Sequence, residues 1–197
     1  EVGTSYILVS GEGDRSLSKL EPLFPPGEKL EPDASGAFLV YRLPGGSRAM
    51  AQPSHPLEAT WDGRIGLIGY NLDRDTVAPG ETLSLSLFYE AVGEIDQRYT
   101  AFVHVLGPVN PESGVPLWAQ RDSEPCQGFY PTTSWNEGEI LVDQIDLQIP
   151  PDAPEGTYTL GTGFYEVWTG ERLPVTSPIA PTDHNVLTLG PPTVTPD

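Results

Sequence analysis

The chain has 197 residues, including 21 glycines and 22 prolines, and a formal net charge of −18. This glycine and proline content favours many short strands joined by turns, because glycine allows positive φ angles and proline fixes φ and ends strands. The excess of 28 acidic over 10 basic side chains argues against nucleic acid as a partner and against charge-driven docking on anionic lipid, since both carry negative charge themselves.

The first 46 residues are predicted to form a small α+β segment. The apolar run at 6–9 is typical of a buried strand, and residues 37–43 predict a second strand. Between them, a serine start and a leucine at every third position over 16–23 predict one or two helical turns. A piece this small should pack on something larger. Residues 47–60 show little periodicity and are interpreted as a linker.

Residues 61–190 are predicted to form the main domain. From Thr82 to Ala91, apolar and polar side chains alternate with a period of two, as in a half-buried antiparallel strand. Further short strands are expected at 65–70, 99–106, 117–121, 140–149, 157–167, 173–175 and 185–189. This spacing favours an immunoglobulin-like antiparallel β-sandwich, with a jelly roll as the alternative. The predicted core includes Leu83, Leu85, Leu87, Val103, Leu160 and Phe164.

Two features after residue 149 refine this prediction. The proline-rich loop at 150–156 is similar to the loop that enters the penultimate strand of immunoglobulin-like domains, where a tyrosine hydroxyl often caps the loop. Tyr158 occupies that place here. Residues 191–197 are rich in proline and threonine and are predicted to be a loose tail.

No pattern typical of a catalytic site is found. The histidines His55, His104 and His184 lie outside metal-ligand spacing of one another or of the single cysteine. His104 lies between two valines and is interpreted as a structural histidine of a strand. Cys126 stands among acids, which disfavour a thiolate, and one cysteine allows no intrachain disulfide. We therefore predict no catalytic residue and no enzyme activity.

One segment could bind a metal. Asn71, Asp73 and Asp75 alternate with other residues on a predicted turn, and their amide and carboxylate oxygens are ligands that suit calcium. The segment lacks the glycine and the closing glutamate of an EF-hand loop. The expectation is therefore no cofactor, with calcium at these three residues as the open alternative.

The aromatic loop at 128–135 carries the most specific prediction of a ligand site. Exposed rings can stack on the C–H faces of sugars, and short hydroxyls can bond to sugar oxygens. The predicted sugar contacts are Tyr130, Thr132, Thr133, Ser134 and Trp135. The alternative, which we prefer, is that Phe129 and Trp135 plug one end of the sandwich as part of its core.

Several motifs together resemble a known family. They are residues 61–70 (WDGRIGLIGY), 79–83 (PGETL), 102–106 (FVHVL), 128–132 (GFYPT) and 150–158 (PPDAPEGTY). As a set they resemble the extracytoplasmic C-terminal β-sandwich of some bacterial polytopic membrane glycosyltransferases of the protein-mannosyltransferase type. The first unit, from Tyr6 to Leu43, resembles the short α+β segment that follows the last membrane helix in such proteins.

This resemblance covers nearly the whole chain but brings no catalytic residue with it. In such enzymes the catalytic acids lie in the membrane portion, which uses a polyprenyl-phosphate sugar donor. The resemblance implies an extracytoplasmic, non-catalytic accessory domain, tethered to the membrane through its parent protein. Its implied partners are the parent's membrane domain and a glycan or acceptor, without direct membrane insertion. The alternative is a free-standing carbohydrate-binding or adhesion module.

Overall fold

The computed structural model describes residues 53–128, 130–190 and 192–195, together with the backbone of three earlier strands. These three are β1 (Ser5–Ser10), β2 (Glu28–Lys29) and β3 (Phe38–Leu43). The long strands that follow are β4 (His55–Trp61), β5 (Ile65–Leu72), β7 (Thr82–Ala91), β8 (Thr100–Leu106), β9 (Leu117–Ser123), β10 (Ile140–Gln148) and β12 (Thr159–Tyr165). Short strands are β6 (Thr76–Val77), β11 (Gly156–Thr157), β13 (Val175–Thr176), β14 (Thr182–Asp183), β15 (Val186–Leu189) and β16 (Thr193–Val194), and two 3-10 turns are η2 (Pro125–Gly128) and η3 (Thr132–Ser134).

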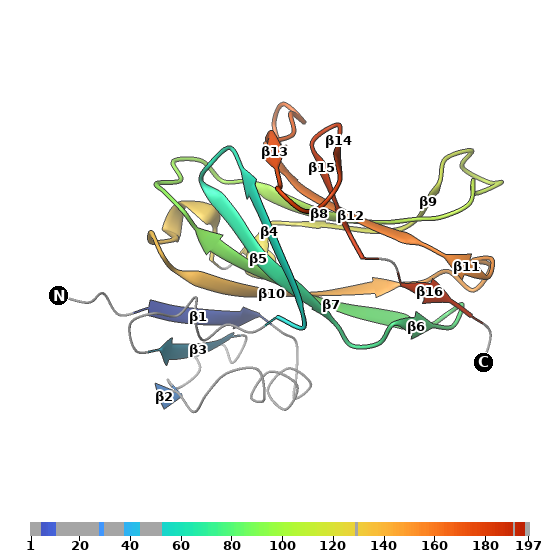
Figure 1. Ribbon diagram of the computed structural model, residues 1–197, viewed down its shortest axis with the longest axis horizontal. Coiled ribbons are helices and arrows are strands. Elements are labelled where there is room, and N and C mark those ends of the chain that lie inside the picture. Colours follow the sequence, from blue (N-terminus) through green and yellow to red (C-terminus); the bar gives the residue numbers. More distant parts are fainter. Residues whose placement is uncertain are drawn as a thin grey trace.

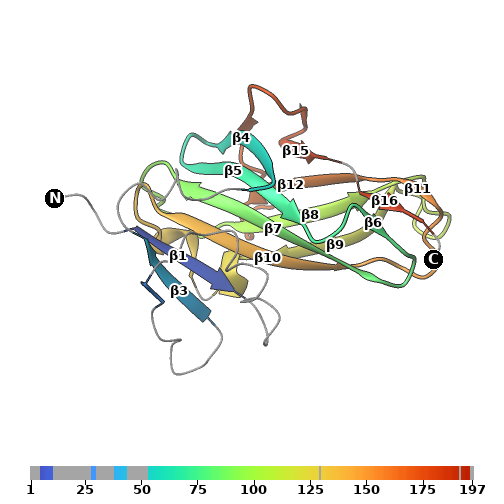
Figure 2. The ribbon, with the colours of Figure 1, turned by 60° about the horizontal axis from the view of Figure 1, so that its bottom comes forward.

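These strands form two main sheets that pack face to face, as Figures 1 and 2 show. The larger sheet has eight strands in the order β13-β4-β5-β7-β10-β1-β3-β2, and the other has five in the order β14-β15-β12-β8-β9. A small third sheet joins β11, β16 and β6. The predicted mainly β sandwich is confirmed. Its two main sheets are antiparallel except where β1 runs parallel to β10.

Alternating side chains produce the core between the sheets. On β7, the leucines at 83, 85 and 87 are at most 1% exposed, while the serines between them are half-buried. Val103, Leu160 and Phe164 from the opposite sheet are fully buried, so the predicted core is confirmed. Each such side chain contributes about 1.5–3 kcal/mol through burial, which is why a period of two is enough to specify the sandwich.

The tyrosine cap is also where the sequence predicts it. The Tyr158 hydroxyl donates a hydrogen bond of 2.7 Å to the carbonyl oxygen of Pro154 and closes the proline-rich loop. The ring lies so close to Gly107 that a Cβ there would stand 2.3 Å from a ring carbon. Glycine at 107 is therefore required by the close approach of the ring.

The structure differs from the prediction at both ends of the sandwich. The predicted linker at 47–60 contains β4, which begins at His55 and pairs with β5. Pro56 obscured this strand, yet it is tolerated because β13 pairs only with the last two residues of β4 and leaves Pro56 on an open edge. At the other end, β16 lies inside the predicted tail and buries Val194.

The first segment is described only in part. The two predicted strands are present as β1 and β3, which pair antiparallel in register from Ser5 opposite Leu43. The helical turns predicted over 16–23 lie outside the described residues. Val9 of β1 pairs with Val142 of β10, so the backbone of this segment continues the larger sheet.

Candidate functional site

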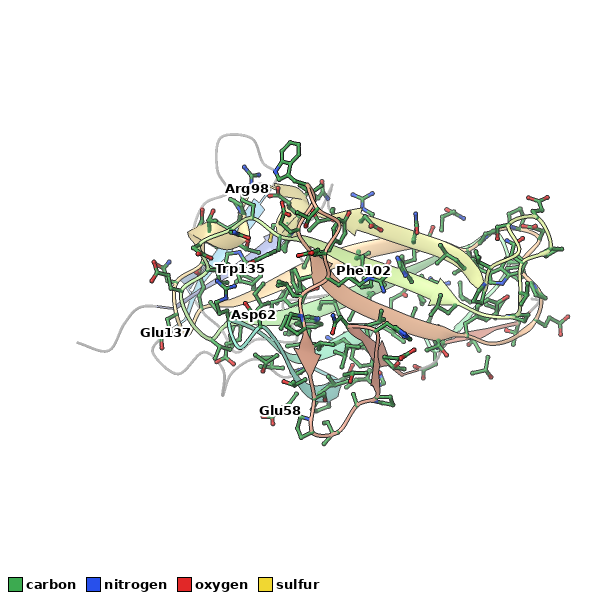
Figure 3. All side chains as sticks on the ribbon, turned by 90° about the horizontal axis from the view of Figure 1, so that it is seen from above. Glu58, Asp62, Arg98, Phe102, Trp135 and Glu137 are labelled. Carbon is green, nitrogen blue, oxygen red and sulfur yellow. The ribbon has the colours of Figure 1, made fainter. Side chains whose placement is uncertain are left out.

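The loop at 125–139, which joins β9 to β10, turns its tryptophan into the core. Trp135 is 6% exposed and stacks on Tyr89, with ring centroids 6.0 Å apart. Its indole nitrogen donates a hydrogen bond of 3.1 Å to the Tyr130 carbonyl oxygen. In Figure 3, Trp135 lies over the interior of the sandwich while Glu137 points outward. Trp135 is therefore a core plug and not an exposed platform, because its apolar ring gains more from burial than from solvent.

The other predicted sugar contacts divide between core and surface. Thr132 is fully buried, and its hydroxyl donates to the Gln97 carbonyl oxygen at 2.7 Å and accepts from the Tyr99 amide. Thr133 and Ser134 are exposed on η3, and Tyr130 is half-buried. Phe129 lies outside the described residues. The structure thus brings these residues onto one loop but leaves only two hydroxyls fully open to a ligand.

A buried glutamate that the sequence did not single out holds this loop. Glu139 is 5% exposed, and its carboxylate accepts hydrogen bonds from the Tyr130 hydroxyl at 2.9 and 3.0 Å and from the Asn136 amide at 2.8 Å. Burial, followed by the negative charge of Glu139, raises the pKa of Tyr130 well above its usual range. Tyr130 therefore stays a neutral hydrogen-bond donor to Glu139.

The candidate calcium ligands are engaged in the protein's own hydrogen bonds. The side-chain oxygen of Asn71 accepts from the Ser54 hydroxyl at 2.7 Å. The Asp73 carboxylate accepts from the Ser84 amide at 2.9 Å and from the Arg74 guanidinium at 3.1 Å. Asp75 is exposed. Within the described ranges, no three His, Cys, Asp or Glu side chains are grouped to hold a metal, and calcium at these positions stays a prediction.

A polar and aromatic cluster lies on the outer face of the five-stranded sheet, which Figure 3 views from outside. In register, Phe102 of β8 lies between Gly163 of β12 and Asp122 of β9. A Cβ on Gly163 would stand 2.6 Å from the Phe102 ring, so glycine lets the ring lie flat across the neighbouring strand. The rings of His104 and Tyr165 lie 4.8 and 6.3 Å from that of Phe102.

Charged groups surround these rings. The Arg172 guanidinium lies over Phe102, 4.9 Å from the ring centroid, in a cation–π contact. Burial raises the pKa of Tyr165, and the neighbouring Asp122 carboxylate adds to that effect. Burial lowers the pKa of His104; Asp122 opposes this effect and Arg172 adds to it. At neutral pH His104 is therefore an uncharged imidazole, in agreement with the structural role predicted for it.

An exposed tryptophan stands at the end of this face. Tyr165 pairs with Arg172 across an antiparallel bridge, and the turn between them presents Trp168 with 92% of its surface exposed. The Glu166 carboxylate accepts hydrogen bonds from the amides of Trp168 and Thr169 at 3.1 and 3.0 Å. Gly170 adopts φ of +73°, which closes the turn. The ring is thus exposed on a turn whose backbone is internally braced.

The strands expected at 157–167 and 173–175 imply a connection between them, but sequence reasoning did not single out Trp168. The available signal was a tryptophan three residues after the end of β12 and two residues before a glycine. We define the binding face as His104, Asp122, Tyr165, Arg172 and Trp168. Phe102, which is 1% exposed, lies beneath Arg172 and supports this face. The binding face combines one exposed ring with a carboxylate, a guanidinium and an imidazole, which is the mixture of apolar surface and few polar groups that small ligands need.

An open groove of about 490 Å³ lies on the outer side of the larger sheet. Its lining includes Glu58, Thr60, Glu90, Val92 and Ser177, and none of its lining residues carries an aromatic ring. The binding face on the other sheet therefore offers an exposed aromatic ring that this groove lacks. No helix in the part of the chain that the structure describes is long and apolar enough to cross a membrane.

Comparisons with known proteins add little to this description. No family model and no curated protein matches the sequence. The C-terminal domain of wzt aligns over 74% of this chain and 83% of its own, at 14% identity and a TM-score of 0.49. A CARDB domain from Pyrococcus furiosus, solved in complex with di-metal ions, aligns over 73% and 99%, at 14% identity and a TM-score of 0.38.

A third solved structure aligns over a smaller part of both chains. The alkylpurine DNA glycosylase AlkC of Pseudomonas fluorescens, bound to DNA containing an abasic site analog, matches 58% of this chain and 30% of its own, at 11% identity and a TM-score of 0.37. At these identities and TM-scores, none of the three likenesses carries information about a ligand.

Proposed function

We propose that this chain is a non-catalytic accessory module that contacts glycan through its binding face. The observation that carries the proposal is Trp168, 92% exposed on a braced turn beside Arg172 and the ring cluster around Phe102. A tryptophan ring in water costs free energy unless a partner covers it. A sugar suits this place, because its C–H face stacks on the indole while its hydroxyls meet nearby polar side chains.

The rigid backbone of the turn at 166–171 favours ligand binding at Trp168. Five hydrogen bonds within 166–171 hold the backbone. Glu166 accepts two through its carboxylate and one, from the Gly170 amide, through its carbonyl oxygen. The other two run from the Glu166 amide to the Glu171 carbonyl oxygen and from the Glu171 amide to the Thr169 hydroxyl. A ligand therefore pays little to order the turn. With one stacked ring and a few polar contacts, the expected dissociation constant is on the order of 0.1–1 mM.

The setting proposed for this module is the extracytoplasmic side, within a membrane glycosyltransferase of the protein-mannosyltransferase type. Support comes from the motifs at 61–70, 102–106 and 150–158, which resemble the C-terminal region of such enzymes. The reading frame upstream of residue 1 tests the parent. About a dozen hydrophobic spans there, each of about 18 or more residues, would support it, and a frame without them would favour a free-standing module.

Titration with neutral and charged oligosaccharides, followed by amide chemical shifts, tests the binding face. Trp168→Ala should weaken binding at least tenfold with the fold intact, since it removes the stacking ring. The matched control is the double variant Thr133→Ala/Ser134→Ala, which removes the exposed hydroxyls of the other loop and should bind like the wild type. If Trp168→Ala binds unchanged while the control loses binding, the site is on the loop at 125–139 and the proposal is wrong.

A further inference from the structure

The arginines after residue 60 differ in how their charge is compensated. This part of the chain has 20 acidic residues but only five arginines and no lysine. Arg64, Arg74 and Arg98 each form ion pairs with carboxylates at 2.7 to 3.1 Å. Arg172 has no carboxylate within ion-pair distance among the described residues. In so acidic a domain, its guanidinium is an uncompensated positive charge.

This guanidinium is also held in place. One face lies on the Phe102 ring at 4.9 Å, and one nitrogen donates to the His184 carbonyl oxygen at 3.4 Å. Arg172 is nevertheless exposed, so a ligand can reach its side chain. A guanidinium that lies on an aromatic ring and remains exposed is positioned to bind a planar anion. Guanidinium groups bind the two oxygens of a carboxylate through two parallel hydrogen bonds.

The neighbouring carboxylate of Asp122 forms no ion pair with this guanidinium. Asp122 pairs with Phe102 in the register of β8 and β9, and it lies close enough to Tyr165 to raise the pKa of that side chain. His104, uncharged at neutral pH, adds no positive charge. The anion-binding capacity of the face therefore resides in one side chain.

We infer that the glycan bound by this face carries an acidic sugar, whose carboxylate pairs with Arg172 while a neighbouring ring stacks on Trp168. The two side chains belong to one hairpin, four residues apart, and so can contact adjacent units of one oligosaccharide. The net charge of −18 repels polyanions at long range, so the ligand is a sparsely charged glycan and not a uniformly charged one. This inference rests on the proposed function, because it names the class of sugar for the same face.

Matched pairs of disaccharides test it. The pairs are cellobiouronate and cellobiose, mannosyl-mannuronate and mannobiose, and galactosyl-galacturonate and galactobiose, each titrated against the full chain with amide chemical shifts as the readout. In at least one pair, the acid should bind about tenfold more tightly than its neutral counterpart, as expected for a charge-assisted bidentate contact. Arg172→Gln should abolish this difference, and Arg172→Lys should keep part of it.

The control is Arg121→Gln. Arg121 is exposed and lies next to Asp122, and it also forms no ion pair among the described residues. Because it stacks on no ring there, its loss should leave the acid preference unchanged. Inorganic phosphate, at the same ionic strength, should not compete with the acidic disaccharide at equal concentration.

The outcomes separate the two proposals. If acid and neutral sugars bind equally, and Trp168→Ala still weakens both, the acidic-sugar inference is wrong and the glycan-binding function stands. If phosphate competes as well as the disaccharide, Arg172 is a simple anion site and the inference is again wrong. If no sugar binds, or binding survives Trp168→Ala, the proposed function itself fails.

Discussion

Two loops of this molecule are built alike and used in opposite ways. The loop at 125–139 and the turn at 166–171 each carry one tryptophan, and each is braced by a glutamate carboxylate that accepts backbone amides. Glu139 accepts from Asn136, and Glu166 accepts from Trp168 and Thr169. Yet Trp135 is 6% exposed and Trp168 is 92% exposed.

The difference in exposure between Trp135 and Trp168 follows from the position of each loop relative to the core. The loop at 125–139 crosses from β9 of one sheet to β10 of the other, so it passes over the end of the core and finds Tyr89 to pack on. The turn at 166–171 connects Tyr165 to Arg172 across a single antiparallel bridge, so its tip extends beyond the sheet, where no core lies. A tryptophan on a tight turn is therefore buried or presented according to topology and not according to its neighbours in sequence.

Truncation of each tryptophan ring tests the different roles of the two loops. Trp135→Ala should destabilise the domain by about 3–5 kcal/mol, because it leaves a cavity beside Tyr89. Trp168→Ala should change the free energy of unfolding by less than about 0.5 kcal/mol, because 92% of the side chain is exposed. Urea unfolding followed by far-ultraviolet circular dichroism measures both. Equal losses in the two variants would show that Trp168 is a structural ring and would contradict the assigned difference.

A second prediction sharpens the role of the buried carboxylate. Glu139→Gln removes the charge of the carboxylate and one of its two acceptor oxygens. The hydrogen bonds from the Tyr130 hydroxyl and the Asn136 amide then lose their charge assistance, and we expect a loss of about 1–3 kcal/mol. The matched control is Glu137→Gln on the same loop, where the side chain is exposed and the change should stay within about 0.5 kcal/mol. Similar unfolding midpoints for the two variants would mean that Glu139 does not hold the loop.

Much of the sandwich could be predicted from sequence because alternation is a local signal. The leucines of β7 alternate with polar residues along a strand of ten residues, and this alternation predicts which face of the strand is buried. A strand is harder to predict where a residue such as proline interrupts the alternation of apolar and polar side chains. Pro56 hid β4, although Leu57, Ala59 and Trp61 are buried in alternation along it. Proline is tolerated at position 56 because β13 leaves that part of β4 unpaired. The sequence alone does not show which part of a strand lies on an open edge.

The binding face could not be predicted in the same way, because its parts come together through pairing between distant strands. Phe102 meets Arg172 only after β8 pairs with β12 and the following hairpin folds back. The sugar site predicted at 130–135 relied on composition, which cannot tell whether a ring turns inward. Glu139 gave no signal in a chain with 28 acidic residues, since only its burial distinguishes it.

The smallest expected effect concerns the brace of the exposed turn. Hydrogen bonds from the Thr169 side chain, and then from the amides of Trp168 and Thr169, lower the pKa of Glu166. Because the folded pKa lies below that of the free side chain, about 4.3, the brace is fully present above that value. It is lost as pH falls through the depressed pKa.

The amide shifts of Trp168 and Thr169 should therefore titrate with a midpoint below that of glutamate in a peptide spanning 164–173. Glu166→Gln should remove this titration while leaving the core resonances around Trp135 unmoved. A midpoint equal to that of the peptide would mean that the turn is not braced by Glu166, and the low ordering cost assigned to Trp168 would lose its physical basis.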